Sequence, residues 1–146
     1  MTDPDHGWRG RGKARIARCD GRIVVRCHGV STRSGRVQEP ILRLLRKDYR
    51  SLRPSYEPFA VSLWIEAPEP ARFDLDNVAK ACLDALNGAV WHDDKQVQRL
   101  AVEKLQAETA AVTIAVEPYA PTSTAHGQAD LADLLLRIDS LESPAP

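Results

Sequence analysis

Three side chains near the middle of the sequence have the types and spacing needed for chemistry on a phosphate group. The stretch RFDLDNVAKACLDALNG, residues 72–88, places Asp74 and Asp76 two positions apart where a helix should begin, with Lys80 one turn later. If Leu75 is extended, both carboxylates point the same way, and Lys80 lies on the helical face of Asp76. Grouped carboxylates bind Mg²⁺, and an ammonium group can stabilise charge that develops on a phosphate.

A structural explanation competes for the same residues. An Asp at a helix start accepts hydrogen bonds from the free amides of the first turn, and for a lone Asp this capping role is the commoner one. Asp76, or Asn77 beside it, needs no other role, but Asp74 lies outside the expected helix and is left without one. Lys80 could likewise form only a surface ion pair with Asp76 or Asp84, which would contribute little to stability.

A second acidic pair follows the expected helix. Asp93 and Asp94 stand in VWHDDK, just after an Asn-Gly break. A short helix that reverses the chain would carry this pair back towards Asp74 and Asp76, and converging carboxylates repel one another unless a cation joins them. We therefore expect a shared divalent-metal site, with the adjacent His92 as an exposed loop residue rather than a ligand.

Charge is distributed unevenly along the chain, although its total is zero. Residues 1–60 hold 14 Lys and Arg against 6 Asp and Glu, residues 61–120 hold 5 against 10, and residues 121–146 hold 1 against 4. The basic half could bind a polyanion while metal ions occupy the acidic half, and attraction between two solvated faces is the simpler alternative. The candidates for contacts with a nucleic-acid backbone are basic side chains near the start: Arg9, Arg11, Lys13, Arg15 and Arg18.

Composition and cysteine usage narrow the class of protein. The chain of 146 residues is 43% hydrophobic and 27% charged, as expected for one globular domain with a core. No stretch approaches a membrane span, and the polar start MTDPDHGWRG shows no signal peptide. The cysteines Cys19, Cys27 and Cys82 are odd in number and far apart, which favours a reducing cytoplasm over a disulfide framework. A zinc site using Cys19, Cys27 and His28 lacks the usual C-x-x-C spacing.

The elements that must position these side chains follow the order β, α, β, α, β, β. This order indicates a single α+β domain with a mixed, mostly antiparallel sheet and helices packed on it. The last two strands are expected to pair as a hairpin across QAET, residues 106–109. The expected elements are a basic loop ending in a hairpin at Asp20-Gly21, a helix over 40–52, a strand over 59–67, a helix closed by Asn87-Gly88, and strands over 96–105 and 110–119.

The end of the chain has a different composition. PTSTAHGQ, from Pro121, is typical of a flexible linker. ADLADLLLRIDSL, residues 129–141, then sets leucines and an isoleucine at helical spacing, and a helix so short needs a packing partner. We expect ESPAP to be disordered. Residues 1–120 would therefore form the domain, and residues 121–146 a linker, a short amphipathic helix and a disordered C-terminus.

The acidic segment resembles a known enzyme family. DLDNVAKACLDALNG, then VWHDD, then VQRLAVEK match in order and distance the core of the RusA-type Holliday-junction resolvases, closely over residues 73–104 and more thinly before them. The resemblance implies that Asp74, Asp76 and Asp94 bind the metal and that Lys80 is needed for cleavage. It also implies Mg²⁺, for which Mn²⁺ should substitute, and a homodimer that cuts two opposed strands of a four-way DNA junction.

Taken with that resemblance, the sequence predicts a cytoplasmic, Mg²⁺-dependent endodeoxyribonuclease that acts on branched DNA in recombination and repair. It would work as a homodimer, with no small-molecule cofactor and no membrane association, and its nuclease domain would span residues 1–120. The alternative is a module of the same fold that binds branched nucleic acid without cutting it, as the weakly basic approach EAPEPARF suggests. Flaps or branched RNA–DNA are further candidate substrates.

Overall fold

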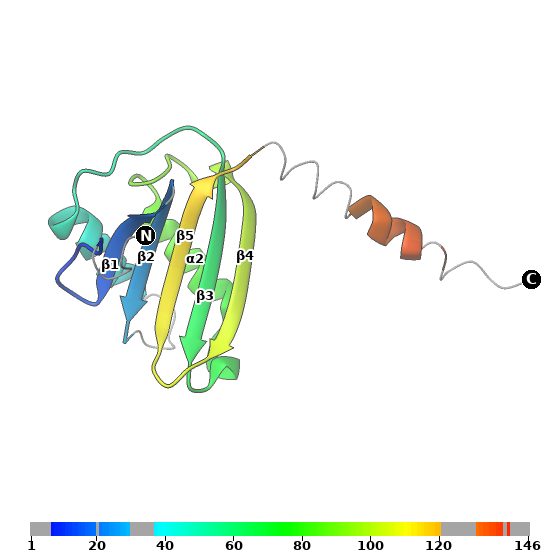
Figure 1. Cartoon of the computed structure of the whole chain (residues 1–146), viewed down its shortest axis with the longest axis horizontal. Coiled ribbons are helices and arrows are strands. Elements are labelled where there is room, and N and C mark those ends of the chain that lie inside the picture. The colour runs from blue at the N-terminus through cyan, green and yellow to red at the C-terminus, as the bar shows by residue number, and fades with distance from the viewer. Residues whose placement is uncertain (1–6, 20, 30–36, 121–130, 139, 141–146) are drawn as a thin grey trace, which may run out of the picture.

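The strands form one mixed sheet in the computed structural model, which describes residues 7–19, 21–29, 37–120, 131–138 and 140. Their order across the sheet is β1-β2-β5-β3-β4 (Figure 1). The β3–β4 pair is parallel and the other neighbouring pairs are antiparallel, which confirms the predicted α+β domain. The strands are β1 (Ala14–Cys19), β2 (Arg22–His28), β3 (Phe59–Ala67), β4 (Val97–Gln106) and β5 (Ala111–Pro118).

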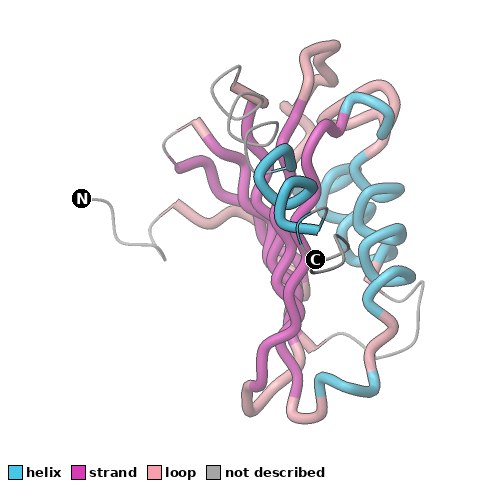
Figure 2. The backbone as a smooth tube through the Cα atoms, turned by 90° about the vertical axis from the view of Figure 1, so that its right-hand side faces the viewer, coloured by secondary structure: helices cyan, strands magenta, loops and turns pink. Residues whose placement is uncertain are grey.

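The helices α1, η1 and α2 lie on one face of this sheet (Figure 2). Strand β3 shows the layering, because its side chains alternate between fully buried and half buried along the whole strand. The core therefore sits between the sheet and the helices. The helical elements are α1 (Gln38–Arg43), the π-helical turn η1 (Leu44–Asp48), the 3₁₀ turn η2 (Pro70–Arg72), α2 (Leu75–Leu86) and the 3₁₀ turn η3 (Asp94–Gln96).

Helix α2 lies in the connection between the two parallel strands. Strands β3 and β4 pair from Phe59–Val97 to Ala67–Gln106, and parallel neighbours require such a crossover. The helix runs back along the sheet, so it begins near the carboxyl end of β3 and ends near the amino end of β4. One side of the helix is apolar, as its side-chain spacing predicts, and is buried: Val78, Cys82, Ala85 and Leu86. Gly88, with φ +81°, adopts the left-handed conformation that ends the helix.

The predicted hairpin of β4 and β5 is wrong. Strand β3 lies between them, parallel to β4 and antiparallel to β5. The connection crosses the end of β3, where the amide of Ala107 donates to the carbonyl of Ala67 at 3.0 Å. Burial explains this strand order. Strand β3 is buried or half-buried along its length and suits a position with a paired strand on each side. Strand β4 is largely exposed and carries the charged residues Arg99, Glu103 and Lys104, which suit the edge of a sheet.

The predicted helix over 40–52 is shorter than expected. The helical conformation ends at Asp48, and Tyr49 leaves it with φ −143°. Leu52 is nevertheless buried, from the irregular segment that follows. The predicted N-terminal hairpin is confirmed by the antiparallel pairing of β1 and β2, although Asp20 itself lies outside the described residues.

The predicted C-terminal helix is present where the structure describes this part of the chain. Residues 131–138 are helical. The predicted linker and disordered end fall on residues outside the described ranges. Among the helices that are described, none combines the length and the apolar character needed to cross a membrane. The large apolar side chains of this helix are between 41% and 67% exposed: Leu131, Leu134, Leu135, Leu136 and Ile138.

Candidate active site

Asp74 and Asp76 lie at the start of α2, as predicted, but their expected roles there are exchanged. Asp74 is the N-cap, and its carboxylate accepts from the backbone amide of Asn77 at 3.5 Å and from the Asn77 side chain at 2.9 Å. Asp76, expected to be the cap, is exposed in the first turn. Leu75 is already helical, so the extended geometry expected to align the two carboxylates is wrong. Capping therefore explains Asp74 and not Asp76.

Lys80 is exposed one turn after Asp76. Its Nζ lies 3.6 Å from Oδ2 of Asp84, and the two side chains are 76% and 35% exposed. A pair this exposed contributes little to stability, so Lys80 can exchange Asp84 for a phosphate with little loss. The expected contact with Asp84 is confirmed, and the catalytic role of Lys80 stays a prediction.

The second acidic pair opens the turn η3. Asp93 caps this turn, since its Oδ1 accepts from the backbone amide of Lys95 at 2.9 Å, and this bond is the main cause that lowers the pKa of the Asp93 carboxyl. Asp94 is the first residue of the turn and is half buried, and His92 before it is exposed, as expected. Capping thus accounts for Asp93, while Asp94 stays available as a ligand.

Gln96, which is not among the sequence-based candidates, fixes the position of this acidic turn. Its Oε1 accepts from the amides of His92 at 2.9 Å and Asp93 at 3.1 Å. Its Nε2 donates to the carbonyls of Ser55 at 2.7 Å and Glu57 at 3.0 Å. One side-chain amide therefore joins two distant loops with all of its hydrogen-bonding groups. The available sequence signal is Gln three positions after Asp93, the pattern of a capping box.

Removing the Gln96 side-chain amide should destabilise the protein. Gln96→Leu breaks four hydrogen bonds that join the two loops, so we expect the free energy of unfolding to fall by about 2 kcal/mol. Chemical denaturation measures the change. Gln98→Leu, at an exposed position on β4, is the control and should change stability by less than about 0.5 kcal/mol. Equal losses in the two variants would contradict the linking role of Gln96.

Asp94 and the pair Asp74–Asp76 lie at opposite ends of α2. The helix has 12 residues, so it is roughly 18 Å long at about 1.5 Å per residue. Mg²⁺ holds its ligands at about 2.1 Å and cannot join both ends of one helix. Accordingly, the part of the chain that the structure describes contains no group of three His, Cys, Asp or Glu side chains that could hold a metal. The expected convergence of the acids does not occur within a single chain.

Two of the predicted backbone-contact residues line a pocket at the β1 edge of the sheet. The pocket has a volume of about 530 Å³, and Arg9, Arg18 and Arg50 reach it from three different segments. Tyr49 also lines it, and the pKa of its phenol is lowered, first by a hydrogen bond with the Ser51 side chain and then by Arg18 and Arg9. The guanidinium groups outnumber the one carboxylate in the lining, that of Asp48, so the pocket suits an anion such as a phosphate.

The loop that carries the other basic candidates is fixed to β1. Arg9 and Ile16 exchange two backbone hydrogen bonds of 2.8 Å each. Gly10 permits this close turn, because an added Cβ would lie 2.7 Å from the carbonyl oxygen of Ala14. The remaining predicted residues are exposed on this loop and strand: Arg11, Lys13 and Arg15.

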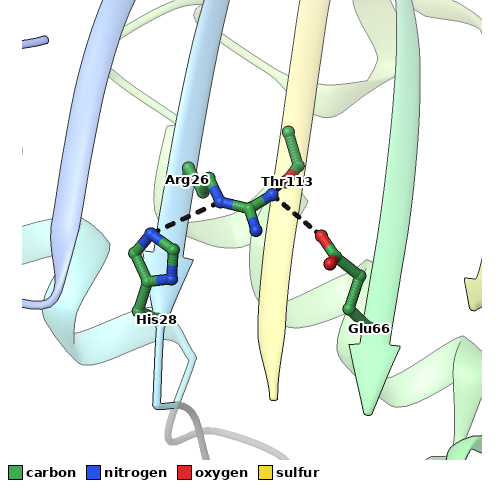
Figure 3. Close-up of polar contacts among 4 residues, drawn as sticks. All are labelled: Arg26, His28, Glu66 and Thr113. Carbon is green, nitrogen blue, oxygen red and sulfur yellow. Dashed lines mark hydrogen bonds and ion pairs between the residues drawn. The ribbon is translucent and has the colours of Figure 1, made fainter. Parts of the chain in front are cut away.

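A further polar cluster crosses the sheet face that α1, η1 and α2 leave open (Figure 3). Arg26 donates to Glu66 at 2.8 Å, to Thr113 at 2.7 Å and to Nε2 of His28 at 3.3 Å. These contacts tie β2, β5 and β3 together, which is a structural role. The bond from Arg26 also occupies Nε2 of His28. Burial raises the pKa of the Cys27 thiol to about 11, which opposes formation of the thiolate that zinc binds. Both observations disfavour the zinc site formed by Cys19, Cys27 and His28.

Comparison with known proteins gave one informative match. A search of curated proteins found none. The family model described as Endodeoxyribonuclease RusA matches residues 41–117, just over half of the 146-residue chain. This region includes both acidic pairs, Lys80 and the whole crossover that positions them, whereas the basic N-terminal loop and the β1–β2 hairpin lie outside it. Because the match spans the crossover and the central strands of the sheet, the chain belongs to the RusA family of endodeoxyribonucleases.

Proposed function

We propose that the protein is a divalent-metal-dependent endonuclease that hydrolyses phosphodiester bonds in four-way DNA junctions. The family match carries this proposal. The matched region, residues 41–117, contains the α2 crossover with the candidate metal-binding aspartates and Lys80, which such hydrolysis needs. Resolution of junctions in recombination and repair is the corresponding role. Residues 1–120 would form the nuclease unit, with residues 121–146 as an appended segment.

The separation of the acids along α2 supports a site shared between two subunits. Each chain offers Asp74 and Asp76 at one end of the helix and Asp94 beyond the other end. Two copies related by a twofold axis could place these ends together and complete two equivalent sites. Each site would take two carboxylates from one chain and Asp94 from the second. A homodimer is then required for catalysis and presents two cutting sites to a junction of near twofold symmetry.

The donor set suits Mg²⁺, with Mn²⁺ as a substitute. Carboxylate oxygens are the ligands that these hard cations prefer, and the exposure of Asp74 and Asp76 leaves room for water and a phosphate. When bound, the metal would polarise the scissile phosphate and lower the pKa of an attacking water. Lys80, one turn after Asp76, would stabilise the negative charge on the phosphoryl or leaving oxygen.

The basic N-terminal loop would hold the DNA backbone without reading its sequence. Replacing Arg11, Lys13 and Arg15 together with Gln should weaken junction binding and reduce the slope of log K against log salt by about 2 to 3, because each phosphate contact contributes roughly 0.9. Titrations at several salt concentrations measure the slope. Arg137→Gln, on the C-terminal helix, removes one positive charge outside this loop and is the control, which should leave the slope unchanged. An unchanged slope in the triple variant would remove this loop from the DNA-binding surface.

A cleavage assay on a labelled four-way junction tests the proposed function. The purified protein should cut opposed strands in Mg²⁺, stop in EDTA, and leave a linear duplex of the same sequence intact. Tight junction binding with no product in Mg²⁺ or Mn²⁺ would favour the alternative, a branched-nucleic-acid-binding module of the same fold. Flap substrates in the same assay define how selective the enzyme is for four-way junctions.

A further inference from the structure

An exposed aromatic pair lies beside the second acidic pair. The rings of Tyr56 and His92 are stacked, with centroids 3.7 Å apart and 16° between their planes. Tyr56 is 81% exposed, so its ring face away from His92 is open to solvent. His92 directly precedes Asp93 and Asp94 in the chain. An open ring face is therefore presented close to a carboxylate proposed to bind the catalytic metal.

Hydrogen bonds, rather than burial, hold this pair in place. The side chain of Gln96 donates to the carbonyls of Ser55 and Glu57, which flank Tyr56 on both sides. The same side chain accepts from the amide of His92. Both rings are thus attached to one fixed point, and a ring positioned before binding loses little conformational freedom when a ligand stacks on it.

The charges around the pair select the kind of ligand that it can take. Exposed carboxylates follow each ring in the chain, Glu57 after Tyr56 and Asp93 after His92, and these would repel a phosphate. A flat and uncharged group meets no such repulsion on the tyrosine ring. Nucleobases fit this description, and they stack on aromatic side chains with little dependence on sequence.

We propose that Tyr56, supported by His92, is a stacking platform for one nucleobase beside the phosphodiester that is cut. The inference rests on the proposed function, because a base is exposed for stacking where paired arms end at a branch point. A strand whose phosphate lies at Asp94 carries a base on each side, so one of them can reach the neighbouring ring. Tyr56 is then a positioning residue that fixes the strand relative to the metal-binding acids.

Two substitutions separate ring stacking from simple apolar contact. Tyr56→Phe keeps the ring, whereas Tyr56→Leu keeps apolar bulk without a ring. A junction with 2-aminopurine at its branch point is titrated in EDTA, so that cleavage plays no part. The wild type and Tyr56→Phe should quench the fluorescence, and Tyr56→Leu should leave it bright and bind roughly tenfold more weakly. Because Tyr56 is 81% exposed, thermal unfolding should match in all three proteins.

The outcomes distinguish the platform from the proposed function. Equal quenching and equal affinity in the Leu and Phe variants would overturn the platform, and so would a wild type that binds without quenching. If the wild type fails to cut any junction in Mg²⁺ yet the variants keep the expected order in the titration, base stacking on Tyr56 is supported, whereas the nuclease proposal and the position beside a cut phosphodiester both fail.

Discussion

Asp76→Asn should abolish junction cleavage, with a rate loss on the order of a thousandfold or more. The substitution keeps the size of the side chain but removes the charged oxygen that a divalent metal needs. It also removes a negative charge from a position close to the bound DNA backbone, so junction affinity should stay unchanged or increase. Single-turnover cleavage in Mg²⁺ and a binding titration in EDTA measure the two effects separately.

A purely structural role for Asp76 predicts a different result. Asp74 caps α2, so Asp76→Asn loses only the favourable charge near the helix N-terminus, about 0.5 kcal/mol of stability. Glu39→Gln, in the first turn of α1, is the matched control and should cut at the wild-type rate. Wild-type cleavage by Asp76→Asn would contradict its assignment as a metal ligand. Melting within a few degrees of the wild type in both variants would exclude unfolding as the cause of any loss.

Mixing two inactive variants should restore cleavage if the acids of one site come from two chains. A heterodimer of an Asp76→Asn chain and an Asp94→Asn chain contains one site with both lesions and one site with none. We therefore expect each homodimer to be inactive and the heterodimer to cut one strand, at about half the wild-type rate per dimer, because one of its two equivalent sites is intact. Differently tagged chains allow the heterodimer to be purified and its nicked product to be counted.

The control for this experiment uses two lesions at the same end of α2. A heterodimer of Asp74→Asn and Asp76→Asn chains carries one lesion in each shared site, so it should stay inactive. Cleavage by this control would show that a single lesion is tolerated. An inactive heterodimer of Asp76→Asn with Asp94→Asn would contradict the shared site, since each site would then draw its acids from one chain.

Local signals predicted the elements better than their arrangement. The α2 stripe and its Asn-Gly end follow from side-chain spacing within a few residues, and the structure confirms both. The predicted cap, Asp76 or Asn77, is wrong, and Asp74 has this role. All three side chains suit a helix start, and only the backbone decides among them. The pairing of β4 with β3 depends on how deeply each strand of the sheet is buried. The spacing of side chains within β4 and β5 alone does not reveal this.

The same difference between local signals and contacts of distant segments applies to the candidate site. The sequence placed Asp74 and Asp76 at the start of a helix, which is where they lie. It placed Asp94 only after the Asn-Gly break, in a segment that the structure shows to be the turn η3. It could not show that α2 carries the chain along the sheet from the carboxyl end of β3 to the amino end of β4, which places the acids at opposite ends of the helix. Gln96 is not among the sequence-based candidates. Its bond to Ser55 joins segments 41 positions apart, and no local pattern predicts such a bond.

In the shared-site arrangement, α2 serves as a molecular ruler. Its 12 residues set the offset between the two halves of catalytic machinery that each chain supplies. One inserted residue would rotate everything after it by about 100° and advance it by about 1.5 Å, so Asp94 would miss its destination on the second subunit. If the proposed shared site is correct, the geometry of the cut would therefore fix the number of turns in this helix.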